Sequence, residues 1–470
     1  MNDFGLLCSF IGNKGIQVKK HLVAISLLSS FMLGGCGSGA DDKGNATPSG
    51  VDKVVTVIDG YLHNASVYVD RNSDGMSDVS EFVSLTDVNG QVVIQNADAA
   101  YSLIAQINAG ETSDADRFGV LNRGYTLTAA PESYVVTPFT TIANEPLISL
   151  ADIASELNIS ERVLADDYIE MKESGNTDAI IAHALARSMT TLPLSEMSAE
   201  QTLLSLVTAL PRIDAYINEN GVKSLNKVTL DLSSTGDFKE IYSSLTDFLG
   251  SSESWSLVSL NRDLYASEGV QFAEVDVEAK RLTLLDSSEV PIVTDDYLID
   301  GSTLLMAGGV ADEFVVNTDK FAFVKTSEMN DLVVWSKVNL AFPFEPELLS
   351  TDDISGSTWN IISDDSTTNV PDIAQARLVF SQILGTPSGS VEIIENGSTR
   401  TEAYYVSTIT DPELGIVSPL TIELGEQDSP LRLVQVAEAD GVKLMYETNR
   451  DMFMVLVQDG SLAENLVSQF

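Results

Sequence analysis

Short β segments separated by tight-turn dipeptides fill the C-terminal part of the chain and restrict its fold more than any other feature. Asn396-Gly397 and Asp440-Gly441 are dipeptides that two-residue hairpin turns favour, because these turns need positive φ angles. About eight strands follow one another from Ser357 to Val457, mostly in sequence-adjacent pairs. Since closure removes exposed edges, we expect residues 346–470 to form an antiparallel up-and-down β-barrel or sheet.

The rest of the chain divides by the period of its apolar residues. Residues 54–143 contain short alternating or β-branched segments with turns between them, and these predict a β-sandwich. Residues 144–250 change to a helical period. Residues 251–345 return to a β pattern, which predicts either a separate sheet or part of a larger one. The expected class is a multidomain, β-rich protein with a helical middle.

Three helices are expected in the middle region. Thr177–Leu192 places its apolar residues on one helical face. Ser198 with Gln201 forms a capping box that opens a second helix running towards Gly221. Asp237–Leu249 predicts a third helix.

Residues 1–35 have the organisation of an export signal. A basic stretch, Lys14 to His21, precedes an apolar run from Leu22 to Leu33. The run is too short for a bilayer, which needs ~20 apolar residues. The basic stretch lies far from Met1, so an alternative start at Val18 stays open.

The apolar run ends in Leu33-Gly34-Gly35-Cys36, which resembles the lipobox of bacterial lipoproteins. The resemblance implies cleavage before Cys36, acylation of its sulfur and attachment to a membrane. Gly37 after the cysteine implies the outer membrane, with the protein facing the periplasm or the cell surface. Residues 36–53 are rich in Gly, Ser, Asp and Asn and predict a flexible tether.

Composition disfavours several kinds of chemistry. Cleavage would remove Cys8 and lipid would occupy Cys36, so the mature chain would contain no disulfide. The formal net charge of −43 repels nucleic acid and attracts divalent cations. Only His63 and His183 follow the signal, too few for a His-based triad or a multi-His zinc site. These features favour a non-enzymatic protein.

Residues Asp70–Glu81 carry a pattern with specific chemistry. Oxygen-bearing residues occupy positions 1, 3, 5, 9 and 12 of the loop, and Gly75 occupies position 6, as in an EF-hand calcium loop. Calcium binds six to eight oxygens in flexible geometry, so we expect a structural calcium ion here. The candidate ligands are Asp70, Asn72, Asp74, Met76 through its carbonyl, Asp78 and Glu81.

The loop follows a strand, Ser66–Val69, and no helix leads into it, so a helix-opening sensor is not expected. Residues 65–94 resemble the calcium-carrying B-type repeats of bacterial surface adhesins and, more broadly, transthyretin-like sandwiches. Val67-Tyr68-Val69-Asp70 and Thr86-Asp87-Val88-Asn89-Gly90-Gln91 carry the resemblance. It implies that calcium stiffens the module and catalyses nothing.

Gly356-Ser357-Thr358-Trp359 resembles the Gly-x-Trp opening of lipocalins, with one residue too many. The resemblance implies that the C-terminal barrel holds an apolar ligand or lipid. Such a cavity would be lined by Val391, Ile393, Tyr405, Leu433 and Met445.

Three pairs of residues have alternative interpretations. His183 and Arg187 lie one helical turn apart and either bind an anion or sit at the edge of a core. Asp114 and Asp116 either join a second cation site or belong to a solvated loop. Trp335 and Trp359 either line a ligand pocket or fill a barrel.

Three functional hypotheses follow. The first is a non-enzymatic, calcium-stiffened interaction protein for adhesion, matrix or complex assembly, with a protein or polysaccharide partner. The second is a carrier of a small apolar ligand or lipid in the C-terminal barrel. The third is an envelope hydrolase with two carboxylates ~5–10 Å apart.

Overall fold

The computed structural model describes residues 52–191, 197–232, 237–306, 309–327, 331–364, 373–383, 388–424 and 429–468. The predicted signal, Cys36 and nearly all of the predicted tether lie outside these residues. The described part is β-rich, with two closed eight-stranded antiparallel barrels and a set of helices, which confirms the predicted fold class. None of its helices combines the length and apolar character needed to cross a membrane.

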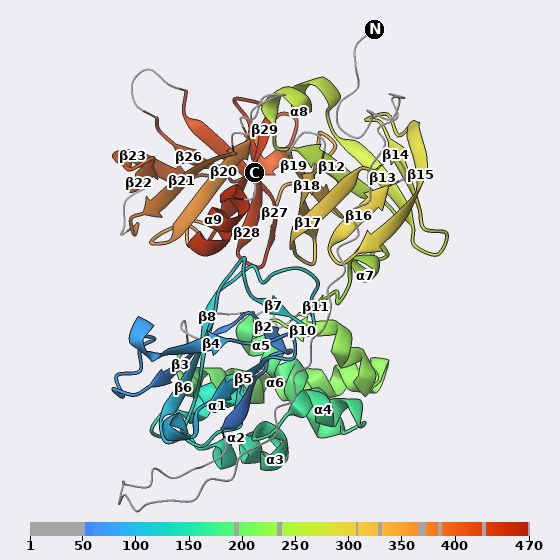
Figure 1. Cartoon of the computed structure of the whole chain (residues 1–470). Coiled ribbons are helices and arrows are strands. Elements are labelled where there is room, and N and C mark those ends of the chain that lie inside the picture. Colours follow the sequence, from blue (N-terminus) through green and yellow to red (C-terminus); the bar gives the residue numbers. More distant parts are fainter. Residues whose placement is uncertain are drawn as a thin grey trace, which may run out of the picture.

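Two lobes make up the molecule (Figure 1). The first contains a β-sandwich with helices packed beside it, and the second contains the two barrels side by side. The sandwich consists of a three-stranded sheet, β5-β1-β9, facing a four-stranded sheet, β4-β3-β6-β8. The strands are β1 Lys53–Val57, β3 Ser66–Asp70, β4 Phe82–Leu85, β5 Gln91–Ile94, β6 Ser102–Ile107, β8 Tyr125–Ala129 and β9 Val135–Val136.

The sandwich core follows from the alternation seen in the sequence. Val55 and Val57 of one sheet face Val67, Val69 and Leu127 of the other, and all five are fully buried. Burial of such side chains contributes about 1.5–3 kcal/mol each. A pair of two-residue strands, β2 Leu62–His63 and β7 Ser113–Asp114, lies beside the sheets.

Helices pack against the sandwich through Ile58, Val135 and Phe139.

The predicted capping box is confirmed: Ser198 accepts from the Gln201 backbone N–H at 3.2 Å, and Gln201 accepts from the Ser198 N–H at 3.0 Å. The helices here are α1 Pro138–Ala143, α2 Leu150–Leu157, α3 Glu161–Leu164, α4 Tyr168–Glu173, α5 Thr177–Thr190 and α6 Ala199–Asn220.

The predicted helix over Asp237–Leu249 is wrong in its first half. Phe238–Glu240 is a strand, β11, which pairs with β10 Val228–Leu230. Only Leu245–Leu249 is helical, as α7, and Ser244 caps its N-terminus through the Asp247 N–H at 3.1 Å. Strand pairing with the preceding segment therefore outweighs the helical period.

The first barrel settles the open question about residues 251–345. It closes by pairing of its first and last strands, β12 and β19. Its interior is filled by aromatic rings. The ring centroids of Phe314 and Trp335 lie 5.4 Å apart, and those of Phe248 of α7 and Trp255 lie 4.6 Å apart. The strands are β12 Trp255–Ser259, β13 Gln271–Asp276, β14 Arg281–Leu285, β15 Pro291–Asp300, β16 Thr303–Met306, β17 Ala311–Asn317, β18 Phe321–Thr326 and β19 Leu332–Ser336.

The second barrel is the one predicted, and it closes between β20 and β29. Asn396-Gly397 and Asp440-Gly441 form its hairpin turns with positive φ angles, as predicted. The barrel strands are β20 Thr358–Asp364, β21 Ile373–Phe380, β22 Gly389–Glu395, β23 Ser398–Val406, β26 Leu420–Ile422, β27 Leu431–Ala439, β28 Val442–Glu447 and β29 Met452–Val457; β24 Ile409–Asp411 and β25 Gly415–Val417 form a separate hairpin.

Four of the five side chains predicted to line a cavity in this barrel belong to its packed core, namely Val391, Ile393, Leu433 and Met445. The prediction for Tyr405 is wrong. Its neighbour Tyr404 is fully buried in that core, whereas the Tyr405 hydroxyl donates to Glu423 at 3.3 Å. Adjacent strand residues point to opposite faces, so Tyr404 points into the barrel and Tyr405 points out of it. The prediction was wrong by one residue.

The two barrels are joined by an apolar interface. Phe321 and Phe323 of the first barrel belong to the same buried cluster as Tyr446 and Phe453 of the second. Two further helices, α8 Arg262–Glu268 and α9 Gly460–Ser468, pack beside it. The shared core makes the barrels one unit.

Residues 108–124, here termed the arm, extend from the sandwich to the barrels between β6 and β8. Asn122 donates to the Asn317 carbonyl at 2.5 Å, and Asn317 donates to the Phe118 carbonyl at 2.6 Å. The Gly124 N–H, just before β8, donates to Asp459 at 2.9 Å. The arm therefore contacts both barrels and ties the two lobes together.

Candidate calcium loop and buried ion network

A strand leads into the candidate calcium loop, as the sequence predicts. β3 ends at Asp70, a short 3₁₀ helix covers Val79–Glu81, and β4 begins at Phe82. The loop thus connects two adjacent, paired strands of the four-stranded sheet.

The first half of the loop is organised by its carboxylates. Asp70 is buried, and its two oxygens accept the N–H groups of Asp74 and Gly75, both at 3.1 Å. Asn72 accepts from the Asp74 N–H at 2.9 Å. Gly75 has φ +74 with open space around the position of a Cβ, so the backbone angle favours glycine there, without crowding.

Glu81 closes the loop from its far end. One carboxylate oxygen, Oε1, accepts the N–H groups of Arg71 and Asn72 at 2.8 and 3.1 Å. The other, Oε2, is buried and has no hydrogen-bond partner among the residues that the structure describes. Ligand oxygens of Asp70, Asp74 and Glu81 lie within 4.8 Å of one another. A buried, unpartnered carboxylate oxygen beside two others is a position that a cation would stabilise.

Asp78 joins the same cluster through Asn72. The Asn72 amide donates to Asp74 at 3.0 Å and to Asp78 at 3.3 Å, so three of the predicted side chains are linked directly. The Met76 side chain is exposed, and its backbone N–H donates to Asp74 at 2.8 Å. These side chains offer oxygen ligands, which hard cations such as calcium prefer.

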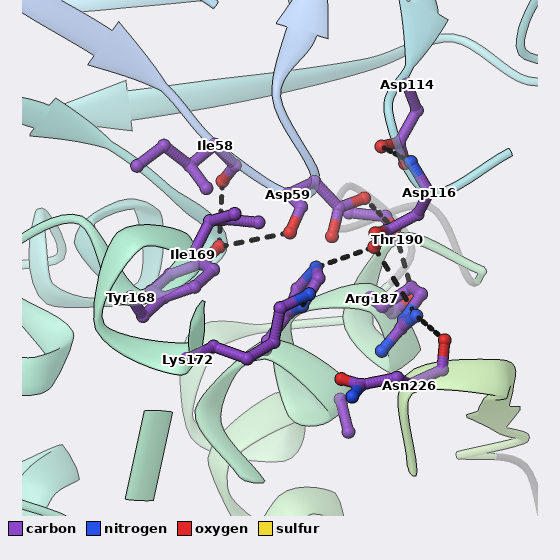
Figure 2. Close-up of polar contacts among 12 residues, drawn as sticks. Ile58, Asp59, Asp114, Asp116, Tyr168, Ile169, Lys172, Arg187, Thr190 and Asn226 are labelled. Carbon is purple, nitrogen blue, oxygen red and sulfur yellow. Dashed lines mark hydrogen bonds and ion pairs between the residues drawn. The ribbon is translucent and has the colours of Figure 1, made fainter. Parts of the chain in front are cut away.

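A second cluster joins two pairs of residues that the sequence left with alternatives (Figure 2). Asp116 of the arm contacts His183 of α5 at 2.6 Å and Arg187 at 3.4 Å. His183 and Arg187 are fully buried, so they lie inside the core and not at its edge as predicted. Asp114 is also buried, with 3% of its surface exposed. The predicted solvated loop is therefore wrong: Asp114 is buried, and Asp116 is paired with both basic residues.

The protonation states follow from these contacts. Burial lowers the pKa of His183 to about 4, and the Arg187 charge adds to this effect against the attraction of Asp116. The neutral ring accepts from the Lys172 ammonium at Nδ1, 2.8 Å away, which leaves its N–H facing Asp116. Burial opposes ionisation of Asp116, but the charge of Arg187 and the hydrogen bond from His183 outweigh it and hold the pKa of Asp116 well below its usual range.

Asp59 and Asp114 complete the network on the sandwich side. Asp59 accepts from Thr190 at 2.5 Å and from Tyr125 at 3.0 Å. Burial, together with repulsion from neighbouring carboxylates, raises the pKa of both aspartates. Gly60 is required beside them, because a Cβ there would lie 1.9 Å from an Asp114 oxygen.

The network brings carboxylates and basic groups together from several elements. Asp59, Asp114 and Asp116 interact with Arg117, Lys172 and Arg187, and the Arg117 guanidinium also lies 3.6 Å from Asp440 of the second barrel. These contacts favour a structural joint between the arm, the helices and the barrel. Asp59, Lys172 and Thr190 had no sequence signal, because their partners are distant in the chain.

The buried neutral His183 gives an expected pH dependence. An unfolded histidine binds a proton below its ordinary pKa of 6.5, whereas His183 in the folded chain does so only near 4. Its contribution to stability is therefore complete above pH 6.5 and is lost as the pH falls towards 4, by about 3 kcal/mol. His183→Gln should reduce this pH-dependent loss in urea unfolding followed by circular dichroism at 222 nm.

The matched control is the exposed His63→Gln, which should leave the pH profile of wild type unchanged. Identical profiles for both variants between pH 6.5 and 4 would contradict a buried neutral His183.

No family model matches this chain, and no curated protein matches it. Among solved structures, the chain is similar to a protein of unknown function of the DUF3598 family from Nostoc punctiforme PCC 73102. The sequences are 14% identical, the match covers 43% of this chain and 92% of that one, and the TM-score is 0.19. A similarity at this level supports no conclusion about fold or function.

Proposed function

We propose that this chain is a lipid-anchored, calcium-binding protein of the bacterial outer membrane that acts through interaction and not through catalysis. The observation that carries the proposal is the Asp70–Glu81 loop, in which the buried Glu81 Oε2 lacks a partner among the described residues and lies beside two further carboxylates. A calcium ion there would connect the end of β3 to the start of β4. Its role would be to stiffen this end of the sandwich.

Anchoring rests on the Leu33-Gly34-Gly35-Cys36 motif, which lies outside the described residues. A lipid on Cys36 followed by the tether would place the sandwich next to the membrane. The remaining domains would then be presented to a protein or polysaccharide partner in adhesion, matrix or complex assembly. His183 is fully buried and paired with Asp116, so it lies out of reach of a substrate.

The carrier alternative requires an empty space within the second barrel. Val391, Leu433 and Met445 are fully buried in a cluster that also contains Phe380 and Tyr404, whose rings lie 4.8 Å apart. These contacts favour a side-chain-filled interior and place the carrier second.

Native mass spectrometry of a soluble version beginning at Ala40, purified with calcium, tests the proposal. We expect one bound calcium ion, its loss in Glu81→Ala, and no organic adduct. A co-purified apolar adduct would instead support the carrier. Absence of calcium from the wild-type protein would contradict the metal site.

A further inference from the structure

A groove of about 610 Å³ lies along the open edge of the sandwich, next to the calcium loop. We call it the edge groove. Its walls come from β4, from β5 and from residues flanking them. They include Arg71, Phe82, Leu85, Asp87, Val93 and Asp98.

Both sheets of the sandwich end at this groove. β4 is the terminal strand of the four-stranded sheet and β5 is the terminal strand of the three-stranded sheet. No strand of the described residues pairs with the outer edge of either. A terminal strand presents a row of unpaired N–H and C=O groups, which another extended chain can satisfy.

The edge lacks the charged residues and prolines that protect many sheet edges, although β4 has only 4 residues and its pairing with β3 contains a bulge. Natural edge strands carry lysine, proline or inward-pointing charges, whereas β4 reads Phe-Val-Ser-Leu and β5 reads Gln-Val-Val-Ile. Large apolar side chains are also exposed along it: Phe82 and Leu85 by 45% each and Val93 by 57%. Backbone groups together with alternating apolar side chains are the features by which a sheet edge recognises an added strand.

We propose that the edge groove binds an extended polypeptide strand of a partner protein, which adds to β4 through main-chain hydrogen bonds. The partner strand has apolar residues at alternate positions and basic residues at its ends. The basic residues follow from charge: Arg71 is already paired with Asp98 at 2.8 Å, Asp87 contributes a further negative charge, and the whole chain carries −43.

The inference rests on the proposed interaction function and gives it a surface. It also connects that surface to calcium, because Arg71 follows Asp70 and Phe82 follows Glu81 in the chain. An ion held by Asp70 and Glu81 would fix the end of the groove that these two neighbours form. Calcium is therefore expected to strengthen binding of the strand without contacting it.

A displayed library of seven-residue peptides, selected on the soluble chain from Ala40 in the presence of calcium, supplies the probe. We expect enriched peptides that alternate apolar and other residues and carry lysine or arginine. A synthetic peptide of this kind should bind in fluorescence anisotropy, and it should slow amide hydrogen exchange over Phe82–Leu85. Leu85→Glu should weaken binding about tenfold or more, since it places a charge on the strand-binding face.

Leu298→Glu is the matched control, because Leu298 is also an exposed strand leucine, but on the first barrel. It should bind the peptide as wild type does. The inference is overturned if no peptide is enriched, if Leu85→Glu binds as tightly as wild type, or if the protected amides lie elsewhere. If the peptide binds equally well with and without calcium, the proposed coupling to calcium is wrong but the strand-binding site stands. If calcium binds and no peptide does, the strand-binding site is wrong and the calcium site stands.

Discussion

Arg187→Met is expected to lower the free energy of unfolding of the sandwich and helical lobe by about 3–5 kcal/mol, the cost of breaking a buried ion pair from one side. Arg187 is 1% exposed and contacts Asp116 at 3.4 Å. It also donates to the carbonyls of Leu225 and Asn226 at 3.2 and 3.3 Å. Methionine would fill similar space but leave Asp116 and both carbonyls without these interactions.

Urea unfolding measured by circular dichroism at 222 nm reports on this lobe, because most of the helical residues lie in it. Arg281→Met is the control: its partner Asp296 lies 3.6 Å away, and both side chains are more than half exposed. An exposed pair contributes less than about 1 kcal/mol. A loss for Arg187→Met no larger than that of the control would contradict the buried network.

Calcium at 10 mM is expected to stabilise the wild-type sandwich by about 1.4–2.7 kcal/mol, given dissociation constants of ~10⁻⁴–10⁻³ M for extracellular modules. Glu81→Gln should abolish this gain. Glutamine keeps an oxygen to accept the N–H groups of Arg71 and Asn72 but removes the charge that a cation requires. Stability should be measured with calcium and with a chelator, and amide hydrogen exchange over Asp70–Leu85 should locate the change.

Glu132→Gln makes the same charge change in an exposed turn of the same sandwich and should retain the full response to calcium. If Glu81→Gln also retained it, the loop would not be the binding site. This comparison separates a specific ion from general screening of a highly acidic chain.

Features encoded by neighbouring residues were predictable from the sequence. The Asn396-Gly397 and Asp440-Gly441 turns follow from local backbone chemistry, and the Ser198–Gln201 capping box follows from residues three apart. The side chains of the candidate calcium loop all lie within Asp70–Glu81, so their convergence requires only one tight loop. In each case the sequence contains both partners of the interaction.

Features that depend on distant pairing were not predictable. The apolar period of Asp237–Leu249 predicts a helix over β11, because the pairing of β11 with β10 leaves no mark on that period. Closure of the first barrel depends on pairs such as Ser256 with Ser336, for which no local signal exists. The ion network brings Asp59 to Thr190, 131 residues away, so its polar residues appeared as isolated candidates with unrelated roles.

The arm has a consequence for the order in which the molecule is completed. Its contacts, and those at its junction with β8, join residues far apart in the chain: Asn122 meets Asn317 after 195 residues, and Arg123 and Gly124 meet Gln458 and Asp459 after 335. Contacts of such separation form late, because the intervening chain must first be made and folded. A chain that stopped before β29 would therefore lack the contacts of Arg123 and Gly124 with Gln458 and Asp459, although Asn122 could still meet Asn317. Resistance to cleavage at Arg123 and Gly124 would then report that synthesis has passed the last strand.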